Sequence, residues 1–202
     1  CAEVDVGVVT GRNSFFCMTE TEAINRKLEE FTVPLVSRSA QVSALNYTKK
    51  DLALQVEKES VTRLLALEPD SDPFQQPFLA KYLEEGITAG VTDGFKCRTR
   101  RNWWQVPSVW VPDGFMLRQI STHPRIIANL SGATSTDTVH RVRTRKGVDV
   151  KRLAVGSFNS ATFALSEVPG RSYGGGILEL EPSECGTLPV VNPELIPSSL
   201  HS

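Results

Sequence analysis

Residues 114–145 read GFMLRQISTHPRIIANLSGATSTDTVHRVRTR, and this stretch decides the fold class. It is rich in β-branched and large apolar residues and is interrupted by Pro124 and by the small residues 131–135, a pattern typical of consecutive strands separated by turns. The residues before it have a similar composition, broken by Pro107 and by the Pro-Asp-Gly turn at 112–114. We therefore predict five strands, near 100–106, 108–111, 115–120, 125–130 and 137–145.

The sequence on either side of this stretch contains both helix and strand patterns. Short apolar or alternating runs predict strands at 4–8, 15–18 and 61–67, a short final strand around 178–180, and short extended pieces within 38–60. Helices are predicted from Thr19 to Pro34, over 74–85 up to Gly86, after Asp149 as the N-terminal cap, and around Phe163.

Because helices and strands follow one another without a regular alternation, we predict an α+β fold. A single domain over residues 1–191 is expected to contain a curved, mixed and mainly antiparallel sheet flanked by several helices. Residues 192–202, which contain Pro and Ser, are expected to form a tail.

The composition is that of a globular protein, with 40% hydrophobic and 22% charged residues. No apolar run approaches the roughly 20 residues that span a bilayer, and residues 1–10 alternate instead of forming a signal peptide. The cysteines lie far apart, so we expect Cys17, Cys97 and Cys185 to be buried free thiols and the compartment to be reducing, hence cytoplasmic. The start at Cys1 in place of Met suggests a piece of a longer chain.

The net charge of −1 conceals a strong asymmetry along the chain. Residues 1–95 contain 9 Lys and Arg against 15 Asp and Glu, and residues 153–202 contain 1 against 5. Residues 96–152, the central basic block, contain 12 Lys and Arg against 3 Asp and Glu. Such a block between acidic flanks predicts one face that meets a polyanion, and the alternative is a salt-bridged surface spread over the fold.

Arginines recur at alternate positions in two of the predicted strands. Alternate residues of a strand share one face at a spacing of roughly 7 Å, which is close to the distance between successive phosphates of one DNA strand. Like charges in such a row repel one another unless a polyanion compensates them, so the rows favour nucleic-acid binding over a solvated strand face. The rows are Arg141, Arg143 and Arg145 on one strand, and Arg98 and Arg100 on the other, with Arg101 opposite.

Polar and aromatic residues close to these rows are candidates for contact with bases or with the DNA backbone. Of the adjacent Trp103 and Trp104, one is expected to be exposed and suited to stacking on bases, and the alternative is that both are partly buried. The glycines within 171–176 would let the backbone approach a phosphate, unless they only form a flexible turn. The further candidates are Asn102, Trp104, Arg125, Thr134, Ser135, Thr136, His140, Arg171, Tyr173, Gly174 and Gly175, and Arg12 and Asn13 are assigned either to DNA or to an interface with another domain.

Catalytic patterns are missing from the sequence. The histidines are scattered without metal-ligand spacing, and no nucleophile motif is present, so we predict no metal site and no catalytic residue in this chain. Asp113, Asp149 and Lys151 can be arranged as a magnesium nuclease, which remains the alternative from the enzyme class. A turn explains Asp113 better, and a helix cap explains Asp149 better.

Several motifs in a fixed order resemble a known family. Residues 7–16 (GVVTGRNSFF) resemble the G-(I/V)-V-T-G-x-N-x-F-F entry into the C-terminal region of TaqI-like adenine DNA methyltransferases and related restriction–modification proteins. The resemblance extends over about residues 4–191. Further similar segments are 82–86 (YLEEG), 101–104 (RNWW) with Val106-Pro107, Pro124-Arg125, 171–178 (RSYGGGIL) and Glu181-Pro182.

The resemblance implies a division of labour between two domains. A preceding Rossmann-like domain would bind S-adenosylmethionine and carry the Asn/Asp-Pro-Pro-Tyr/Phe catalytic motif, and neither that motif nor a cofactor-binding glycine pattern occurs here. The C-terminal domain would read double-stranded DNA while the adenine flips into the pocket of the other domain.

We therefore expect a target-recognition module that is not an enzyme on its own, that binds no cofactor itself and no membrane, and that works with the N-terminal methyltransferase domain of its parent. The alternatives are a Mg-dependent DNA nuclease domain and a subunit-docking domain whose arginine face meets an acidic partner.

Overall fold

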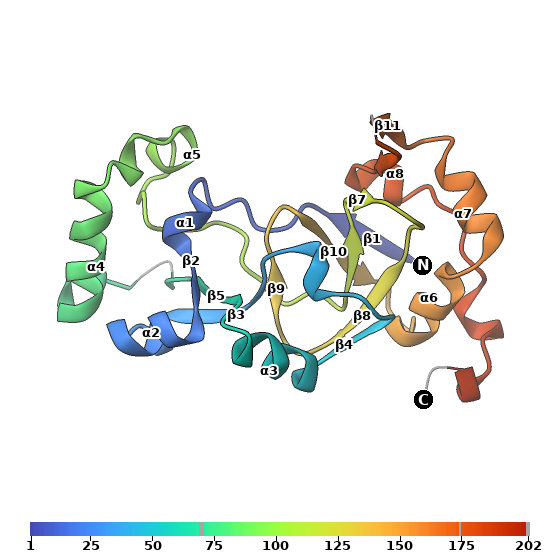
Figure 1. The fold of residues 1–202 in the computed structure, drawn as a ribbon, viewed down its shortest axis with the longest axis horizontal. Helices are drawn as coiled ribbons and strands as arrows, with labels where there is room; N and C mark the ends of the chain where they lie inside the picture. Colours follow the sequence, from blue (N-terminus) through green and yellow to red (C-terminus); the bar gives the residue numbers. More distant parts are fainter. Residues whose placement is uncertain (69–70, 174, 201–202) are drawn as a thin grey trace.

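The chain forms an elongated body with two hydrophobic cores, one toward each end (Figure 1). The description rests on a computed structural model, which covers residues 1–68, 71–173 and 175–200. We call the part around Phe16, Leu64 and Leu83 the first lobe, and the part around Phe115 and Ile127 the second lobe. Each of these five side chains is fully buried, so each lobe has its own hydrophobic stabilisation.

A five-stranded sheet forms the centre of the second lobe. In spatial order its strands are β1 (Ala2–Asp5), β10 (Val139–Thr144), β6 (Gly114–Leu117), β8 (Ile126–Leu130) and β4 (Asn46–Thr48). Neighbouring strands are antiparallel, except that β4 and β8 are parallel. The helix α6 (Val150–Ser157) packs on β8 and contributes Leu153 to the core.

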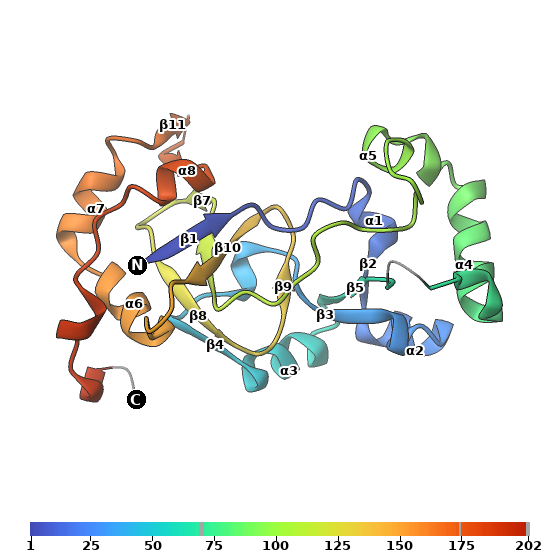
Figure 2. The same ribbon diagram turned by 180° about the vertical axis from the view of Figure 1, so that it is seen from behind.

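A small antiparallel sheet and two short helices complete the outer end of the second lobe (Figure 2). The sheet consists of β11 (Arg171–Tyr173), β12 (Ile177–Glu179) and β7 (Gln119–Ile120), and the helices are α7 (Ser160–Ser166) and α8 (Pro182–Cys185). The C-terminal segment then returns along α6, where the Val191 amide donates to the Gly156 carbonyl at 3.0 Å. Pro193 and Ile196 in this segment are buried.

The first lobe combines a four-stranded sheet with most of the remaining helices. Its strands, in spatial order, are β2 (Cys17–Thr19), β5 (Val61–Leu65), β3 (Thr32–Val36) and β9 (Thr134–Ser135). Its helices are α1 (Asn13–Phe16), α2 (Glu20–Arg26), α4 (Pro77–Thr88) and α5 (Phe95–Arg98), and α3 (Lys49–Glu57) lies between the lobes (Figure 1). Short 3-10 turns occur at Glu29–Phe31, Ser39–Gln41, Pro73–Gln75, Val91–Asp93, Pro193–Leu195 and Ser198–Leu200.

The strand β3 connects the two lobes through its hydrogen bonds. Residues 32–34 of β3 pair with β5 in antiparallel fashion, and Leu35 and Val36 pair with β9 in parallel fashion. In the chain, β9 lies between β8 and β10 of the second lobe. The strand β3 therefore joins the sheet of the first lobe to the part of the chain that forms the five-stranded sheet of the second lobe.

The predicted α+β class is confirmed, although the strands form three sheets in the described residues instead of a single curved one. The strands predicted near 61–67, 115–120, 125–130, 137–145 and 178–180 are present. The cap of α6 is also confirmed, because the Asp149 carboxylate accepts from the Lys151 amide at 2.8 Å.

Several local predictions were wrong. The helix after Thr19 ends at Arg26, because Lys27 takes a left-handed conformation (φ 57°). Pro34 lies within β3, at the point where the pairing with β5 ends and the pairing with β9 begins, so its missing amide hydrogen breaks no regular ladder. Residues 49–57 form α3 instead of extended pieces, because Thr48 and Asp51 make a capping box at its start.

Further differences concern the ends of the predicted elements. The first strand ends at Asp5, and residues 15–18 are divided between α1 and β2. Gly86 lies inside α4 and not at its end. Glycine suits this position because a side chain would collide with packed aromatic rings.

The strands predicted near 100–106 and 108–111 do not form. After α5 the chain follows an irregular path between the lobes up to β6, and we call residues 99–113 the connecting segment. Hydrogen bonds from side chains to backbone carbonyls fix this segment, where a strand would have used a ladder of backbone pairs. Arg100 donates to the Val9 carbonyl at 2.9 Å, and Arg141 donates to the Ser108 carbonyl at 2.6 Å.

Candidate nucleic-acid interface

The cations of the central basic block divide into those used inside the fold and those left on the surface. Four arginines donate to protein groups: Arg100, Arg118, Arg125 and Arg141. Six side chains are exposed and take part in no ion pair within the described residues: Lys96, Arg98, Arg101, Arg143, Arg145 and Lys146. The other two cations of the block, Lys151 and Arg152 in α6, are half-exposed, so the six exposed side chains are the most accessible to an external anion.

Arg141 belongs to the buried group, with 2% of its side chain exposed. Its Nε donates to the Val6 carbonyl at 2.9 Å, and a terminal nitrogen lies 3.3 Å from the Asp5 carboxylate. Burial lowers the pKa of Arg141, and the nearby Asp5 charge opposes this shift. Because its donors meet the connecting segment at Ser108 and the end of β1, Arg141 ties these two pieces of chain together.

Arg141 and Arg143 do share one face of β10, as their alternation predicts. The guanidinium carbon of each lies 4.3 Å from the centroid of the Trp110 ring. The ring of Trp110 and the neighbouring chain cover Arg141, whereas Arg143 and the following Arg145 are exposed. Of the predicted arginine row, Arg143 and Arg145 are therefore accessible to an external anion, and Arg141 is not.

A second group of cations lies around α5, which is at the top of the first lobe in Figure 1. We call the side chains of Arg12, Phe95, Lys96, Arg98 and Arg101 the α5 tip. All five are exposed, and the four cations form no ion pair within the described part of the chain. The predicted strand pairing of Arg98 with Arg100 does not occur, because Arg98 ends α5 and Arg100 turns inward to the backbone of Val9.

Trp103 and Trp104 of the connecting segment are both half-buried, which was the alternative prediction. Trp103 lies in an aromatic cluster with Phe15 and Phe16, at centroid distances of 5.6 and 6.4 Å. Trp104 lies at the rim of this cluster, with an edge contact to Phe74 at 5.3 Å. Trp103 thus packs in the core of the cluster, and Trp104 packs against its edge, at 6.0 Å from Trp103.

A cleft of about 530 Å³ runs beside the connecting segment. Its apolar lining is made by Val33, Ala66, Leu67, Val106, Pro107 and Val109, and its polar lining by Glu68, Arg100, Arg101, Gln105 and Ser108. The cleft brings Arg101 of the α5 tip next to the half-exposed Gln105, so cationic and amide donors line one surface depression.

Five predicted contact residues are buried and are used by the protein itself. Ser135 donates to the Val139 carbonyl at 2.8 Å, and Thr136 donates to the Ser37 carbonyl at 2.9 Å. The buried set is Thr134, Ser135, Thr136, His140 and Arg141. None of these side chains reaches the surface, and Ser135, Thr136 and Arg141 bind backbone carbonyls of neighbouring segments.

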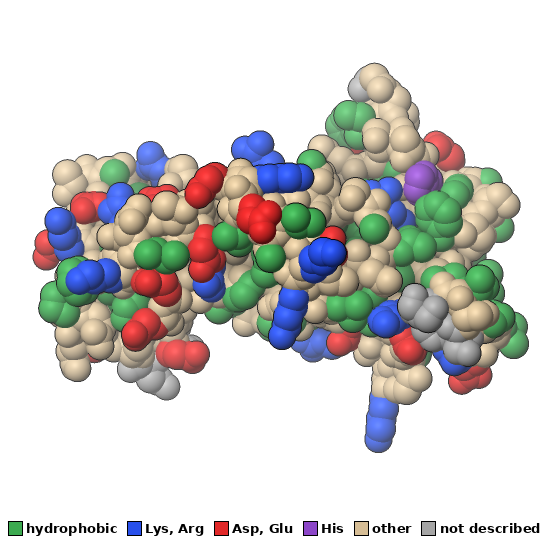
Figure 3. All heavy atoms as spheres, turned by 60° about the horizontal axis from the view of Figure 1, so that its bottom comes forward, with side chains coloured by type: hydrophobic (Ala, Val, Ile, Leu, Met, Phe, Trp, Pro, Cys, Tyr) green, Lys and Arg blue, Asp and Glu red, His purple; other side chains and the backbone are tan. Residues whose placement is uncertain are grey.

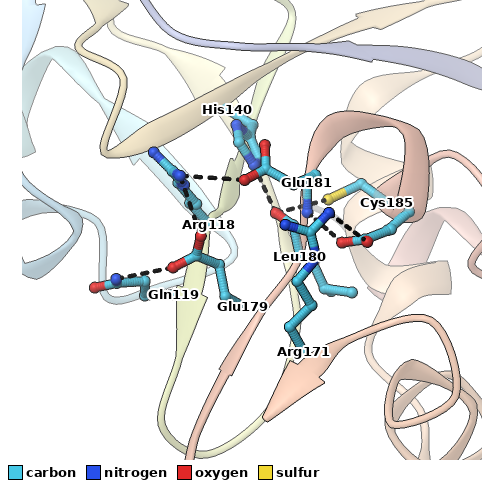
Figure 4. A network of polar contacts seen from close by, with 9 residues as sticks. Arg118, Gln119, His140, Arg171, Glu179, Leu180, Glu181 and Cys185 are labelled. Atoms are coloured by element: carbon cyan, nitrogen blue, oxygen red, sulfur yellow. Dashed lines mark hydrogen bonds and ion pairs between the residues drawn. The ribbon is translucent and has the colours of Figure 1, made fainter. Parts of the chain in front are cut away.

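His140 and Arg171 take part in a network with carboxylates at the outer end of the second lobe (Figure 4). His140 Nε2 lies 2.8 Å from the Leu180 carbonyl, and Arg171 forms an ion pair with Glu184 at 3.2 Å. Burial lowers the pKa of His140 and so favours the uncharged ring. The acidic character of this network makes it a poor phosphate site.

Arg118 occupies the centre of the same network. It donates to Glu179 and to Glu181, each at 3.1 Å (Figure 4). The Glu179 carboxylate also accepts from Gln119 at 3.1 Å, and this hydrogen bond and Arg118 hold the pKa of Glu179 below its usual value. The network fixes β12 against β7.

The remaining predicted residues lie at separate places. Asn13 starts α1 and accepts from Thr10 at 2.5 Å, and the half-buried Asn102 lies in the connecting segment. The half-buried Arg125 donates to the Val42 carbonyl at 3.2 Å. Tyr173 and Gly175 are exposed on the outer end of the second lobe, and Gly174 lies outside the described residues.

Three further side chains are exposed near these cations but were not among the predicted contact residues: Phe95, Lys96 and Lys146. A signal for the first two was present, because residues 94–112 contain no Asp or Glu.

The carboxylates of the nuclease alternative are both engaged. Asp113 accepts from the Thr144 amide at 2.8 Å, and Asp149 caps α6. No group of three or more His, Cys, Asp or Glu side chains within the described ranges could hold a metal ion.

The charges visible on one face of the molecule are interspersed. Figure 3 shows Lys and Arg side chains alternating with Asp and Glu across that face. An anion would therefore be attracted to local groups of unpaired cations and not to a uniform surface. In the described part of the chain, no helix is both long enough and apolar enough to cross a membrane.

Comparison with known families gives a match over nearly the whole chain. The family model of the type II methyltransferase M.Eco57I, C-terminal domain, matches residues 1–201. A search of curated proteins finds no match.

Proposed function

Because the chain belongs to the family of the C-terminal domain of the type II methyltransferase M.Eco57I, we propose that it is a DNA target-recognition module. Its parent would be an S-adenosylmethionine-dependent adenine methyltransferase of a restriction–modification system. The N-terminal methyltransferase domain of that parent would bind the cofactor and carry out the methyl transfer.

The observation that carries the DNA-binding part of this proposal is the set of exposed cations without acidic partners. Arg12, Lys96, Arg98 and Arg101 lie at the α5 tip, and three more follow at Arg143, Arg145 and Lys146. In a protein with a net charge of −1, most such cations could have been neutralised locally by carboxylates. Phosphate groups of a duplex would provide the missing counter-charge and would position the domain, while base contacts would supply sequence specificity.

The proposed contact set is therefore smaller than the one expected from sequence. It keeps the exposed cations together with Asn102 and Trp104 of the connecting segment. It leaves out the buried residues Thr134, Ser135, Thr136, His140 and Arg141, because no duplex can reach their side chains.

A salt titration tests the proposal. Binding to a mixed-sequence duplex is measured by fluorescence anisotropy between about 50 and 200 mM salt, a range over which several phosphate contacts change the affinity strongly. The double variant Arg98→Ala/Arg101→Ala should reduce the slope of log K against log salt by about 0.9 for each lost phosphate contact. The matched control is Lys49→Ala/Lys50→Ala, which removes two exposed cations from the start of α3.

Two results would count against the proposal. Absence of binding even at low salt, combined with tight association with the catalytic domain, would support the subunit-docking alternative. Cleavage of plasmid DNA that disappears in Asp149→Ala would support the nuclease alternative, which the cap role of Asp149 speaks against.

A further inference from the structure

Phe95 is the most exposed aromatic side chain among the described residues, with 65% of its surface accessible. Exposing a phenylalanine to water is unfavourable, and single exposed apolar residues are nevertheless common. Exposure of Phe95 alone therefore does not indicate a ligand, whereas the fixed helix and the charges around it do.

The helix that carries Phe95 is fixed firmly to the first lobe. Cys97, two residues later, is completely buried, and its Sγ lies 3.9 Å from the Thr10 carbonyl. The turn at Gly11 packs directly on α5, since a Cβ at Gly11 would lie 2.8 Å from Cβ of Lys96. The Arg12 side chain, which follows this turn, donates to the Gly90 carbonyl at 3.2 Å. Phe95 thus points to solvent from a rigid support, which reduces the ordering cost of binding.

The charged side chains within residues 94–112 are all positive. Arg12, Lys96, Arg98 and Arg101 are the other members of the α5 tip, and residues 94–112 contain no acidic side chain. Asp93, which precedes this stretch, makes a local contact with Thr92 at 3.5 Å. A protein partner would need an acidic surface with an apolar centre, whereas a DNA groove combines flanking phosphates with base edges that include the apolar thymine methyl group.

We propose that α5 enters a groove of duplex DNA, with the Phe95 ring against the bases and the surrounding cations on the flanking phosphates. This inference rests on the proposed function and adds to it the element that meets the bases. Apolar contact of a phenylalanine with base edges or with a base step is an established way for a groove-binding element to sense sequence and shape.

Affinity and salt dependence together test this inference. Phe95→Ala should weaken binding of the chain to a mixed-sequence duplex by about tenfold, the order expected for the loss of one aromatic contact with a base. The slope of log K against log salt should equal that of the unsubstituted chain, because no phosphate contact is lost. Phe95→Tyr, which keeps the ring, should restore most of the affinity.

Phe78→Ala is the matched control. Phe78 is 51% exposed on α4, and the Lys27 ammonium lies 4.3 Å from its ring, so it has a similar exposure and a cation nearby but lies outside the α5 tip. Its substitution should leave binding unchanged. If Phe95→Ala bound as tightly as Phe78→Ala, the inference would be wrong although salt-dependent DNA binding persisted.

Photochemical cross-linking gives an independent readout. A mixed-sequence duplex with 5-bromouracil in place of thymine is irradiated in complex with the chain, and the cross-linked peptide is identified by mass spectrometry. A peptide containing Phe95 is expected, and a cross-link found only elsewhere, for example at Trp104, would overturn the inference. If the unsubstituted chain bound no duplex at all, the proposed function would fail, and this inference would fail with it.

Discussion

The guanidinium carbon of Arg141 lies 4.3 Å from the centroid of the Trp110 ring, and the arginine is almost completely buried. The aromatic face attracts the cation, and the carbonyls of Val6 and Ser108 accept its hydrogen bonds. This contact joins β10 to the connecting segment. It therefore determines where the half-exposed Trp110 and the exposed Arg143 are placed.

Replacing Arg141 should destabilise the fold. Arg141→Met keeps the aliphatic volume but removes the donors to the Val6 and Ser108 carbonyls and the cation against Trp110. We expect a loss of about 2–4 kcal/mol in the free energy of unfolding. Arg143→Met, on the same strand and against the same ring, should cost less than about 1 kcal/mol because Arg143 is exposed. Urea unfolding followed by circular dichroism measures both, and equal losses would contradict the structural role of Arg141.

Gly86→Ala should also destabilise the protein, although alanine normally favours a helix interior over glycine by about 1 kcal/mol. A Cβ at this position would lie 2.6 Å from the Phe15 ring and 2.8 Å from the Trp103 ring, and both rings are packed in the first lobe. Overpacking should outweigh the helix propensity and lower the free energy of unfolding by about 1–3 kcal/mol. Thr88→Ala, at the exposed end of the same helix, is the control and should change stability little. A higher melting temperature for Gly86→Ala would show that the rings can move aside.

Stability should decrease in acid partly through the Glu20–Arg63 ion pair. Arg63 donates to both carboxylate oxygens, at 2.5 and 2.7 Å, and these hydrogen bonds hold the pKa of Glu20 below its ordinary value while burial opposes the shift. A carboxyl group whose pKa is lower in the folded state stabilises the fold above its unfolded pKa. That contribution is lost as the pH falls through the folded value.

Urea titrations at pH 7 and at a series of values below about pH 4.3, the ordinary glutamate range, should therefore show declining stability. The variant Glu20→Gln should lose part of this decline. The remainder should persist, since the pKa values of Asp51 and Glu179 are also lowered. An unchanged acid limb in Glu20→Gln would exclude the ion pair as a contributor.

Thiol reactivity should distinguish Cys1 from the other three cysteines. Burial raises the pKa of Cys17 and of Cys185 to about 12, and Cys97 is completely buried, whereas Cys1 is exposed. Because the thiolate is the reactive form, a chromogenic disulfide reagent should modify one thiol rapidly in the native protein and all four in urea. Rapid native modification of a Cys1→Ser variant would indicate that one of the buried thiols becomes accessible.

The sequence predicted those elements whose pattern is local. Asp149 marked the start of α6, because a helix cap requires only a side chain and the amides that follow it. The strands β6, β8 and β10 were found because they are continuous, buried and bounded by turn residues. The burial of Cys17, Cys97 and Cys185 was likewise predicted correctly.

The failures concern features that depend on distant parts of the chain. The composition of residues 100–111 is typical of a strand, yet contacts from Val9 and Arg141 hold this segment in an irregular path. The alternation of Arg141 and Arg143 gave the shared face correctly, but no local pattern revealed that Trp110 would cover one of them. The sequence predicts Thr136 and His140 as contact residues because they are polar and lie close to the arginine row of 141–145. Their partners, Ser37 and Leu180, are distant in sequence.

The double pairing of β3 has a consequence for the spacing between the α5 tip and Arg143. Since the same strand pairs with β5 and with β9, a change in the separation of the two lobes would break backbone hydrogen bonds of a ladder. The distance between the α5 tip and Arg143 is therefore held by backbone hydrogen bonds. If both groups hold one duplex, an additional base pair between their contact points would shift one of them by about 3.4 Å and roughly 35° around the helix axis, and the chain could then engage only one at a time.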